Sequence, residues 1–295
     1  MKFLKKHIFL SLFIILFSIC LTTKYLTSSE SKISFDFNYL NNNKVVSNTK
    51  TLLLNNNIPK ENINLWLDYV KKYNLKSKSF IQKTCDGWIN INLNRYNKIN
   101  FAENLNGWTE EDDSLDLNCR ISAFMLMKDM ISSESFTKKH DPTIEKEIQR
   151  ISTVFEDNFT DKNATTFRSL FTPIDLDIYD FKNPNVYDET LKTLKDCWKK
   201  ENLIFKNSTP SLIQAVLIEP NDTKVLATPG HAGLLVEDSN ILYFIEKKNP
   251  CFPYQVSRFQ NYNDLNQYIL TQFKDIKNCK LMILQNDELI FKYDI

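Results

Sequence analysis

The chain has 295 residues, of which 42% are hydrophobic, so it can bury a substantial core in one or two domains. Its 37 Lys and Arg residues nearly balance its 36 Asp and Glu residues, which gives a formal net charge of +1. The basic residues are dispersed rather than clustered, and the sequence therefore argues against a nucleic-acid partner.

The first residues have the layout of an export signal. Three lysines precede an apolar run over residues 8–21, and polar residues follow. The run is short for a membrane span, so residues 1–30 are predicted to be a cleaved signal peptide or an uncleaved anchor. Cys20 would also allow lipid attachment, as in a lipoprotein, although the bulky Ile19 before it disfavours this reading. In each case the protein is expected to be extracellular, secreted or membrane-anchored, and to touch the membrane only through this segment.

Residues 31–295 are expected to form one domain in which helices come first and strands come late. Apolar residues at helical spacing predict helices over residues 59–74, 118–132, 144–157, 188–202 and 261–273. Apolar runs predict strands over residues 211–218, 231–237, 241–247, 280–285 and 288–293. A helical first half followed by an antiparallel sheet, with one helix inserted, is an α+β arrangement.

Five cysteines lie in the part expected to be exported: Cys85, Cys119, Cys197, Cys251 and Cys279. An odd number in an oxidising compartment leaves at least one thiol unpaired within the chain. The sequence contains no Cys-X-X-Cys pair, and only two histidines accompany the five cysteines. We therefore expect no metal site and no cofactor.

Cys119 has the best setting for a reactive thiol. Asn118 is a candidate N-cap, which would place Cys119 in the first turn of an apolar helix. The exposed amides and the dipole of a helix N-terminus lower the pKa of a thiol there. The spacing equally allows a small hydrophobic side chain in the packed face of the helix. Cys85 lies in a segment typical of a turn, so its activation is harder to explain.

His231 and Glu246 lie at the two ends of a predicted hairpin. A two-residue loop at Asp238 and Ser239, or a four-residue loop over residues 237–240, would place His231 directly opposite Glu246. The Cβ atoms of facing residues on an antiparallel strand pair are about 5 Å apart, close enough for the Glu246 carboxylate to accept a hydrogen bond from the His231 imidazole. A three-residue loop would send Glu246 to the other face. The plain alternative for Glu246 is an ion pair with a lysine at the strand end.

Two of the four glycines of the chain, Gly230 and Gly233, flank His231. They predict a groove or a tight entry into the strand, although a turn would explain Gly230 alone. The remaining histidine of the expected domain, His140, lies in a charged segment and is expected at the surface.

Cys119, His231 and Glu246 have the residue types and the chain order of a nucleophile, a base and an orienting acid in papain-like and NlpC-type enzymes. Gln255 or Gln214 could donate to an oxyanion together with the backbone amide of Cys119. The resemblance to these enzymes implies a papain-like or NlpC-like α+β domain with a nucleophile-bearing helix.

Several segments resemble an uncharacterised family of exported proteins from low-GC Gram-positive bacteria, domain of unknown function 4300. The shared features are Cys-Arg at 119–120, Gly-His-Ala-Gly at 230–233, Glu-Lys at 246–247 and Pro-Tyr-Gln at 253–255. The resemblance covers most of the chain from about Phe37 onwards and implies a fold and a compartment, but no activity. A more distant similarity is to NlpC-type papain-like hydrolases, from which the long separation of the cysteine and the histidine departs.

The first functional hypothesis is an extracellular cysteine hydrolase, a thiol peptidase or amidase, that cleaves an amide bond in a cell-wall peptide or a protein. The second is a non-catalytic extracellular binding protein on the same scaffold. The third is a transglutaminase-like acyltransferase, which would use the same three residue types. An exposed thiol within reach of the imidazole would favour an enzyme, and a thiol packed under other side chains would favour a binding protein.

Overall fold

The computed structural model describes residues 33–77, 87–99, 117–155, 158–178, 180–206, 209–221, 224–248 and 252–295. The predicted export signal, Cys85 and Cys251 lie outside these residues. Within the described part of the chain, no helix combines the length and the hydrophobicity that a membrane span requires.

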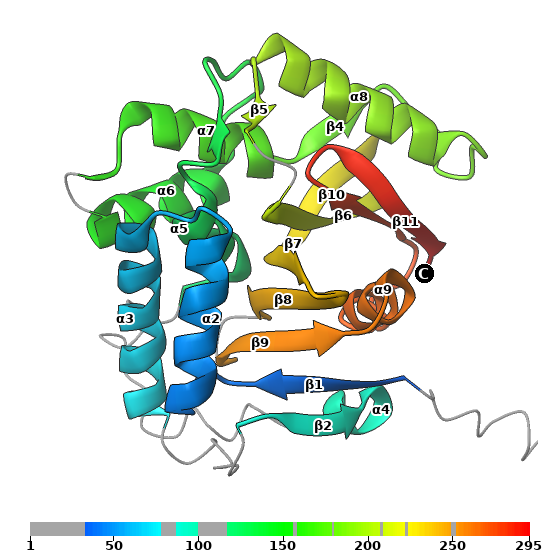
Figure 1. The fold of residues 1–295 in the computed structure, drawn as a ribbon. Helices are drawn as coiled ribbons and strands as arrows, with labels where there is room; N and C mark the ends of the chain where they lie inside the picture. The colour runs from blue at the N-terminus through cyan, green and yellow to red at the C-terminus, as the bar shows by residue number, and fades with distance from the viewer. Residues whose placement is uncertain are drawn as a thin grey trace, which may run out of the picture.

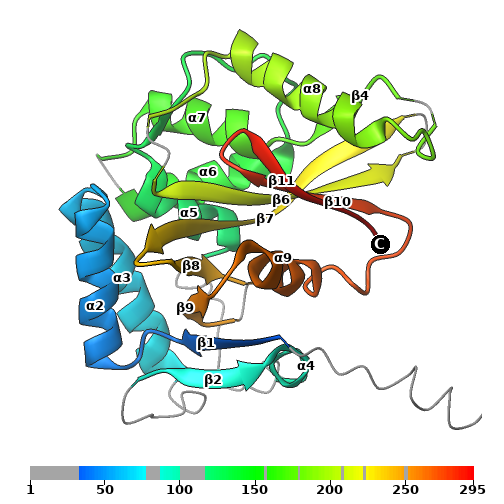
Figure 2. The ribbon, with the colours of Figure 1, turned by 45° about the vertical axis from the view of Figure 1, so that its right-hand side comes forward.

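A large antiparallel sheet organises the described residues (Figure 1). Its strands lie in the order β11 (Glu288–Asp294), β10 (Lys280–Gln285), β6 (Ser211–Pro220), β7 (Val225–Asp238), β8 (Ile241–Lys247), β9 (Tyr254–Phe259), β1 (Ser34–Asn38) and β2 (Ile89–Asn92). A short strand, β4 (Ile174–Leu176), pairs with the first part of β7. Figure 2 shows the strands stacked from β6 and β7 down to β1 and β2. A separate two-stranded sheet joins β3 (Ile131–Ser132) to β5 (Ile204–Phe205).

Helices cover both faces of the sheet (Figures 1 and 2). Apolar residues of one face of β7, β8 and β9 pack in one core cluster with α2 (Asn43–Asn55), α3 (Lys60–Lys76), α5 (Cys119–Met127), α6 (Pro142–Phe155) and α7 (Asp161–Phe171). The other face packs with α4 (Leu93–Tyr96) and α9 (Tyr262–Leu270). A third cluster lies between α8 (Val186–Lys200) and strands β4, β6 and β10. The central strands are therefore buried on both sides, which explains why they are apolar on both faces.

The α+β class is confirmed, and the described first half of the chain is mainly helical, but it also contributes strands that were not predicted. Strands β1 and β2 come from the first hundred residues and extend the sheet beyond β9. β1 is only 5 residues long and β2 only 4, and each depends on a strand distant in sequence, which local patterning does not reveal. The predicted helix over residues 118–132 ends at Met127, because Ile131 and Ser132 pair with β5.

The β7–β8 hairpin has a different register from the predicted one. Its two-residue loop consists of Ser239 and Asn240, both with positive φ, 50° and 63°, as a type I′ turn requires. Asn adopts this conformation more readily than most residues, so the loop lies one residue later than predicted. Glu246 consequently pairs with Gly233, and the prediction that it faces His231 directly was wrong by two positions. A shift of two residues leaves both side chains on the same face.

Candidate active site

The candidate site lies where one edge of β7 is left open. Strand β6 pairs with β7 over residues 225–235 and occupies one edge. On the opposite edge, β4 pairs with residues 225–227 and β8 with residues 233–238. Among the described strands, none pairs with residues 228–232 on that edge. The backbone N–H of Ala232 donates instead to the sulfur of Cys119.

The N-terminus of α5 places Cys119 at this open edge. As predicted, Asn118 is the N-cap: its φ and ψ are extended, and its Oδ1 accepts a hydrogen bond of 2.9 Å from the N–H of Ile121. Cys119 is the first residue of the helix, and α5 packs on β7 and β8. The cap and the packing together hold the sulfur against the sheet.

The structure brings Cys119, His231 and Glu246 together. The Nε2 atom of His231 lies 2.6 Å from Oε2 of Glu246. The imidazole of His231 also forms a hydrogen bond with the thiol of Cys119. Because Nε2 contacts Glu246, this second hydrogen bond uses the other ring nitrogen, Nδ1. His231 reaches Glu246 diagonally, since the partner of Glu246 across the strands is Gly233. The side chains come from α5, β7 and β8.

All three side chains are enclosed. Cys119 is 8% exposed, His231 2% and Glu246 1%. The reach of the imidazole to the thiol is the feature expected of an enzyme, whereas the burial of the thiol is the feature expected of a binding protein. A buried carboxylate and imidazole are costly unless they pair, and here each has the other as its partner.

The electrostatics of the site favour a thiolate and an imidazolium. Burial by itself would raise the pKa of Cys119, but the charge and hydrogen bond of His231, the charge of Arg120 and the N–H of Ala232 together lower it. Burial would lower the pKa of His231, but Cys119 and then Glu246 raise it above its usual value. The two shifts have one cause, because each charged group stabilises the other.

Glu246 is held as an anion by several donors. Burial would raise the pKa of its carboxyl, but the hydrogen bond and charge of His231, the hydroxyl of Tyr268 and the charge of Lys248 lower it. The hydroxyl of Tyr268, on α9, donates to Oε1, and the amide of Gln272 lies 3.4 Å from Oε2. Tyr268 was not among the site residues predicted from the sequence. A tyrosine on the buried face of a predicted helix, whose hydroxyl needs a partner, is the signal that would have identified it.

The two glutamines considered as oxyanion donors already donate within the protein. Nε2 of Gln255 lies 2.6 Å from Oγ of Ser257 and 3.2 Å from the hydroxyl of Tyr268. Gln255 pairs with Glu246 across β8 and β9, so it stands behind the carboxylate. Nε2 of Gln214 donates to the carbonyl oxygen of Leu170 at 3.1 Å, and its side chain is fully buried. The geometry therefore does not support an oxyanion-binding role for the side-chain amide of Gln255 or of Gln214.

Arg120, next to Cys119, forms a second link between α5 and its surroundings. Its guanidinium makes a two-point hydrogen-bonded ion pair with Glu147 of α6, through Nε to Oε2 at 3.0 Å and through Nη2 to Oε1. Its Nη1 donates to the carbonyl oxygen of Pro229 at 3.0 Å. This Arg therefore ties the start of α5 to the strand segment that carries His231.

The remaining candidate groups lie elsewhere. His140 is at the surface, as expected, with a side chain 66% exposed and paired with Glu145 at 2.7 Å. Cys197 and Cys279 are free thiols, and burial raises the pKa of each. Within the described residues, no three His, Cys, Asp or Glu side chains are grouped so that they could hold a metal ion.

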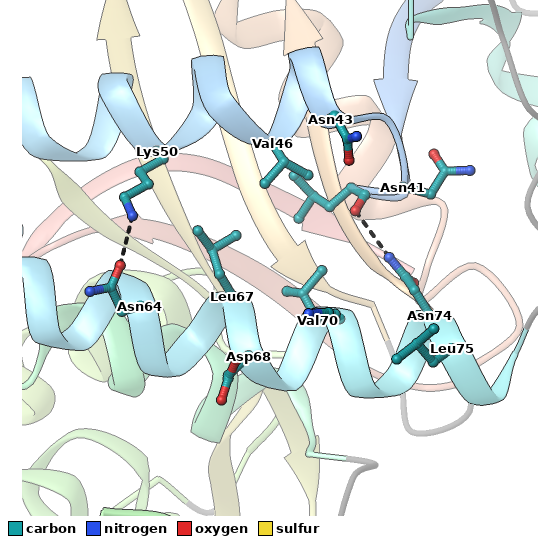
Figure 3. A pocket seen from close by; sticks show the side chains of 12 residues that line it. Asn41, Asn43, Val46, Lys50, Asn64, Leu67, Asp68, Val70, Asn74 and Leu75 are labelled. Carbon is teal, nitrogen blue, oxygen red and sulfur yellow. Dashed lines mark hydrogen bonds between the residues drawn. The ribbon is translucent and has the colours of Figure 1, made fainter.

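A cavity of about 650 Å³ lies between α2 and α3 (Figure 3). Aliphatic side chains, among them Val46, Leu67 and Val70, line its floor, and Asn74 donates from its rim to the carbonyl oxygen of Leu40. None of Cys119, His231 and Glu246 belongs to its lining. This cavity is therefore separate from the candidate site.

Comparison with known proteins yields a family and no activity. No curated protein and no solved structure matches the chain. A family model described as a domain of unknown function (DUF4300) matches residues 36–290. The chain therefore belongs to this family, which agrees with the resemblance seen in the sequence.

Proposed function

We propose that the protein is an extracellular cysteine hydrolase that cleaves an amide bond, with a cell-wall peptide or a protein as substrate. One observation carries the proposal: Cys119, His231 and Glu246 form a continuous hydrogen-bonded series at a helix N-terminus. Apolar side chains would stabilise this part of the core better than three ionisable groups do, so the series has a chemical rather than a structural purpose.

The reaction follows from the charges of the site. The thiolate of Cys119 attacks the carbonyl carbon of the substrate amide and forms a tetrahedral oxyanion. The imidazolium of His231 gives its proton to the leaving nitrogen, the C–N bond breaks, and a thioester with Cys119 remains. His231 then takes a proton from water, which attacks the thioester and releases the carboxylic acid and the thiolate. Glu246 keeps the ring in place and stabilises its charged form throughout.

The oxyanion is proposed to be stabilised by backbone rather than by a glutamine. The N–H of Cys119 is in the first turn of α5, where N–H groups have no acceptor within the helix. This N–H lies at the positive end of the helix dipole and belongs to the same residue as the sulfur, so we propose that it donates to the oxyanion.

The arrangement of elements supports a papain-like fold for the site. A cysteine begins a helix that packs on an antiparallel sheet, the histidine is on one strand and the acid is on the next. We propose that α6, α7 and α8, which lie between Cys119 and His231 in the chain, are the insertion that separates this protein from NlpC-type hydrolases.

The alternative is a binding protein on the same scaffold, and the burial of Cys119 favours it. A thiol that is 8% exposed offers little surface to a substrate carbonyl. The two functions differ in what happens at the sulfur, so a test that captures an acylated Cys119 separates them.

The full-length protein should be incubated with cell-wall peptides and with an unfolded protein, and the products examined by mass spectrometry. A hydrolase produces new carboxyl and amino ends, and rapid acid quenching captures an acyl group on Cys119. Cys119→Ser should abolish both, while Cys279→Ser, a change at another buried free thiol, should leave both intact. Native protein with an inert Cys119 and no cleavage would instead identify a binding protein.

A further inference from the structure

A buried series of polar side chains stands behind Glu246, on the side away from Cys119. It consists of Tyr268 of α9, Gln255 and Ser257 of β9, and Tyr96 of α4, and each of these side chains is at most 2% exposed. The surrounding residues are aromatic: Phe35, Phe37, Phe244 and Phe259 pack against the two tyrosine rings. A polar series in such an apolar setting has to be satisfied internally.

The direction of each hydrogen bond in this series can be deduced. The hydroxyl of Tyr96 lies 2.7 Å from Oε1 of Gln255, and an amide oxygen only accepts, so Tyr96 is the donor. This contact fixes the amide of Gln255 with its Nε2 toward Tyr268, 3.2 Å from the hydroxyl oxygen. Tyr268 therefore accepts from Gln255.

The single proton of Tyr268 is then committed to Glu246. The hydroxyl of Tyr268 contacts Oε1 of a carboxylate, which accepts and does not donate. The two hydroxyls of Tyr96 and Tyr268 lie 3.3 Å apart, but each proton is already used elsewhere. Burial, and next the charge of Glu246, raise the pKa of both tyrosines, so both stay protonated donors.

We propose that Tyr268 is a positioning residue of the site, whose hydroxyl, oriented by Gln255 and Tyr96, holds the carboxylate of Glu246 against the imidazole of His231. One carboxylate oxygen is occupied by Tyr268 and the other by His231, so the group has no freedom to rotate. The inference rests on the proposed function, because it assigns a role in the same Cys119–His231–Glu246 series.

Loss of the Tyr268 hydroxyl has a defined consequence for charge. Oε1 of Glu246 would remain buried without this donor, so the carboxylate would turn away or take up a proton. Either response removes negative charge from beside His231, and the imidazolium then stabilises the thiolate of Cys119 less. The other charged or titratable groups that face this series are Arg120, beside Cys119, and Lys248 and Tyr96, beside Glu246. None of them replaces a donor to Oε1.

The test measures the pH at which the Cys119 thiolate forms, from the rate of iodoacetamide alkylation of the full-length protein followed by peptide mapping. The midpoint is the pH at which half of the Cys119 thiols are ionised. Tyr268→Phe should raise this midpoint by about one pH unit, a tenfold change in the ionisation equilibrium. The matched control is Tyr187→Phe, because the hydroxyl of Tyr187 also donates to a carboxylate, Asp294 Oδ1, at 2.7 Å, in another part of the protein. The control should leave the midpoint unchanged.

A third variant, His231→Ala, separates failure of this inference from failure of the proposed function. If His231→Ala raises the midpoint but Tyr268→Phe behaves like the control, Tyr268 only packs, and the proposed function stands. If His231→Ala leaves the midpoint where it was, there is no thiolate–imidazolium pair and both proposals fall.

A fourth variant, Gln255→Leu, tests the inference even if Tyr268→Phe does not fold. Gln255→Leu leaves the Tyr268 hydroxyl in place but removes the amide that orients it. It should raise the same midpoint by a smaller amount than Tyr268→Phe. A midpoint equal to that of the unmodified protein, in a folded Gln255→Leu variant, would overturn the inference.

Discussion

The guanidinium of Arg120 donates a hydrogen bond of 3.0 Å to the carbonyl oxygen of Pro229. The residue that follows Cys119 is thereby tied to the strand two residues before His231. The two halves of the candidate site are more than a hundred residues apart in the chain, and this contact between a side chain and the backbone joins them directly. The pair with Glu147 holds the same guanidinium from α6.

Replacing Arg120 with lysine should therefore destabilise the protein. Lysine cannot make the two-point contact with Glu147 and reach Pro229 as well, so a buried carboxylate loses part of its pairing. We expect the free energy of unfolding to fall by about 1–3 kcal/mol in urea denaturation. Arg168→Lys is the control, since Arg168 makes a similar two-point pair with Glu145, which is 35% exposed. It should cost less than about 1 kcal/mol, and equal losses would contradict this account.

The described thiols should differ in alkylation in an order that exposure does not explain. The pKa of Cys119 is lowered, chiefly by His231, whereas burial raises the pKa of Cys197 and Cys279. The lowered pKa means that the Cys119 thiolate forms at a lower pH than an ordinary cysteine thiolate does, and it is protonated only as the pH falls through this lowered pKa. At pH 7 iodoacetamide should modify Cys119 first, although Cys197 is more exposed. Modification of Cys197 ahead of Cys119 would show that accessibility alone sets the order.

Glu246→Gln should narrow the pH range in which the proposed hydrolysis proceeds. The raised pKa of His231 means that the imidazolium persists below that pKa and is lost as the pH rises through it. Without the negative charge of Glu246 this loss occurs at lower pH, and kcat/KM should also fall by about 100-fold or more. The pH profile of hydrolysis measures both effects.

The control for Glu246→Gln is Glu145→Gln, which alters the exposed His140–Glu145 pair at the surface. It should leave the profile of hydrolysis unchanged. An unshifted alkaline limb in Glu246→Gln would mean that the carboxylate does not act through His231.

Gly233→Ala should be more harmful than Gly230→Ala. A Cβ at Gly233 would lie 2.4 Å from two atoms of the Phe244 ring and 3.2 Å from the carbonyl oxygen of Ile245. Phe244 is fully buried, so its ring cannot yield without moving the core, and Gly233 pairs directly with Glu246. We expect a loss of about 1–3 kcal/mol in thermal or urea unfolding. At Gly230 the nearest contact is 3.1 Å, to the Leu217 side chain, and the loss should be smaller. The reverse order would contradict this packing argument.

Much of the fold could be predicted because its signals are local. Helices α3, α5, α6, α8 and α9 and strands β6, β7, β8, β10 and β11 overlap the predicted ranges. Each carries its own spacing of apolar residues, which is a property of a short stretch of chain. The sequence did not predict helices α2, α4 and α7 or strands β1, β2, β3, β4, β5 and β9. Apart from β9, these strands have five residues or fewer, and all of them depend on partner strands for their stability.

The candidate site divides in the same way. The sequence by itself determined that Cys119 begins a capped helix, since capping depends only on neighbouring residues. Whether His231 and Glu246 share one face depended on the length of the hairpin loop, which the structure shows to be the two residues Ser239 and Asn240. The open edge of β7 that admits Cys119 and the hydroxyl of Tyr268 behind Glu246 were decided by the tertiary structure. These features depend on packing between segments far apart in the chain, where small differences in turn geometry and burial select among arrangements that the local pattern allows equally.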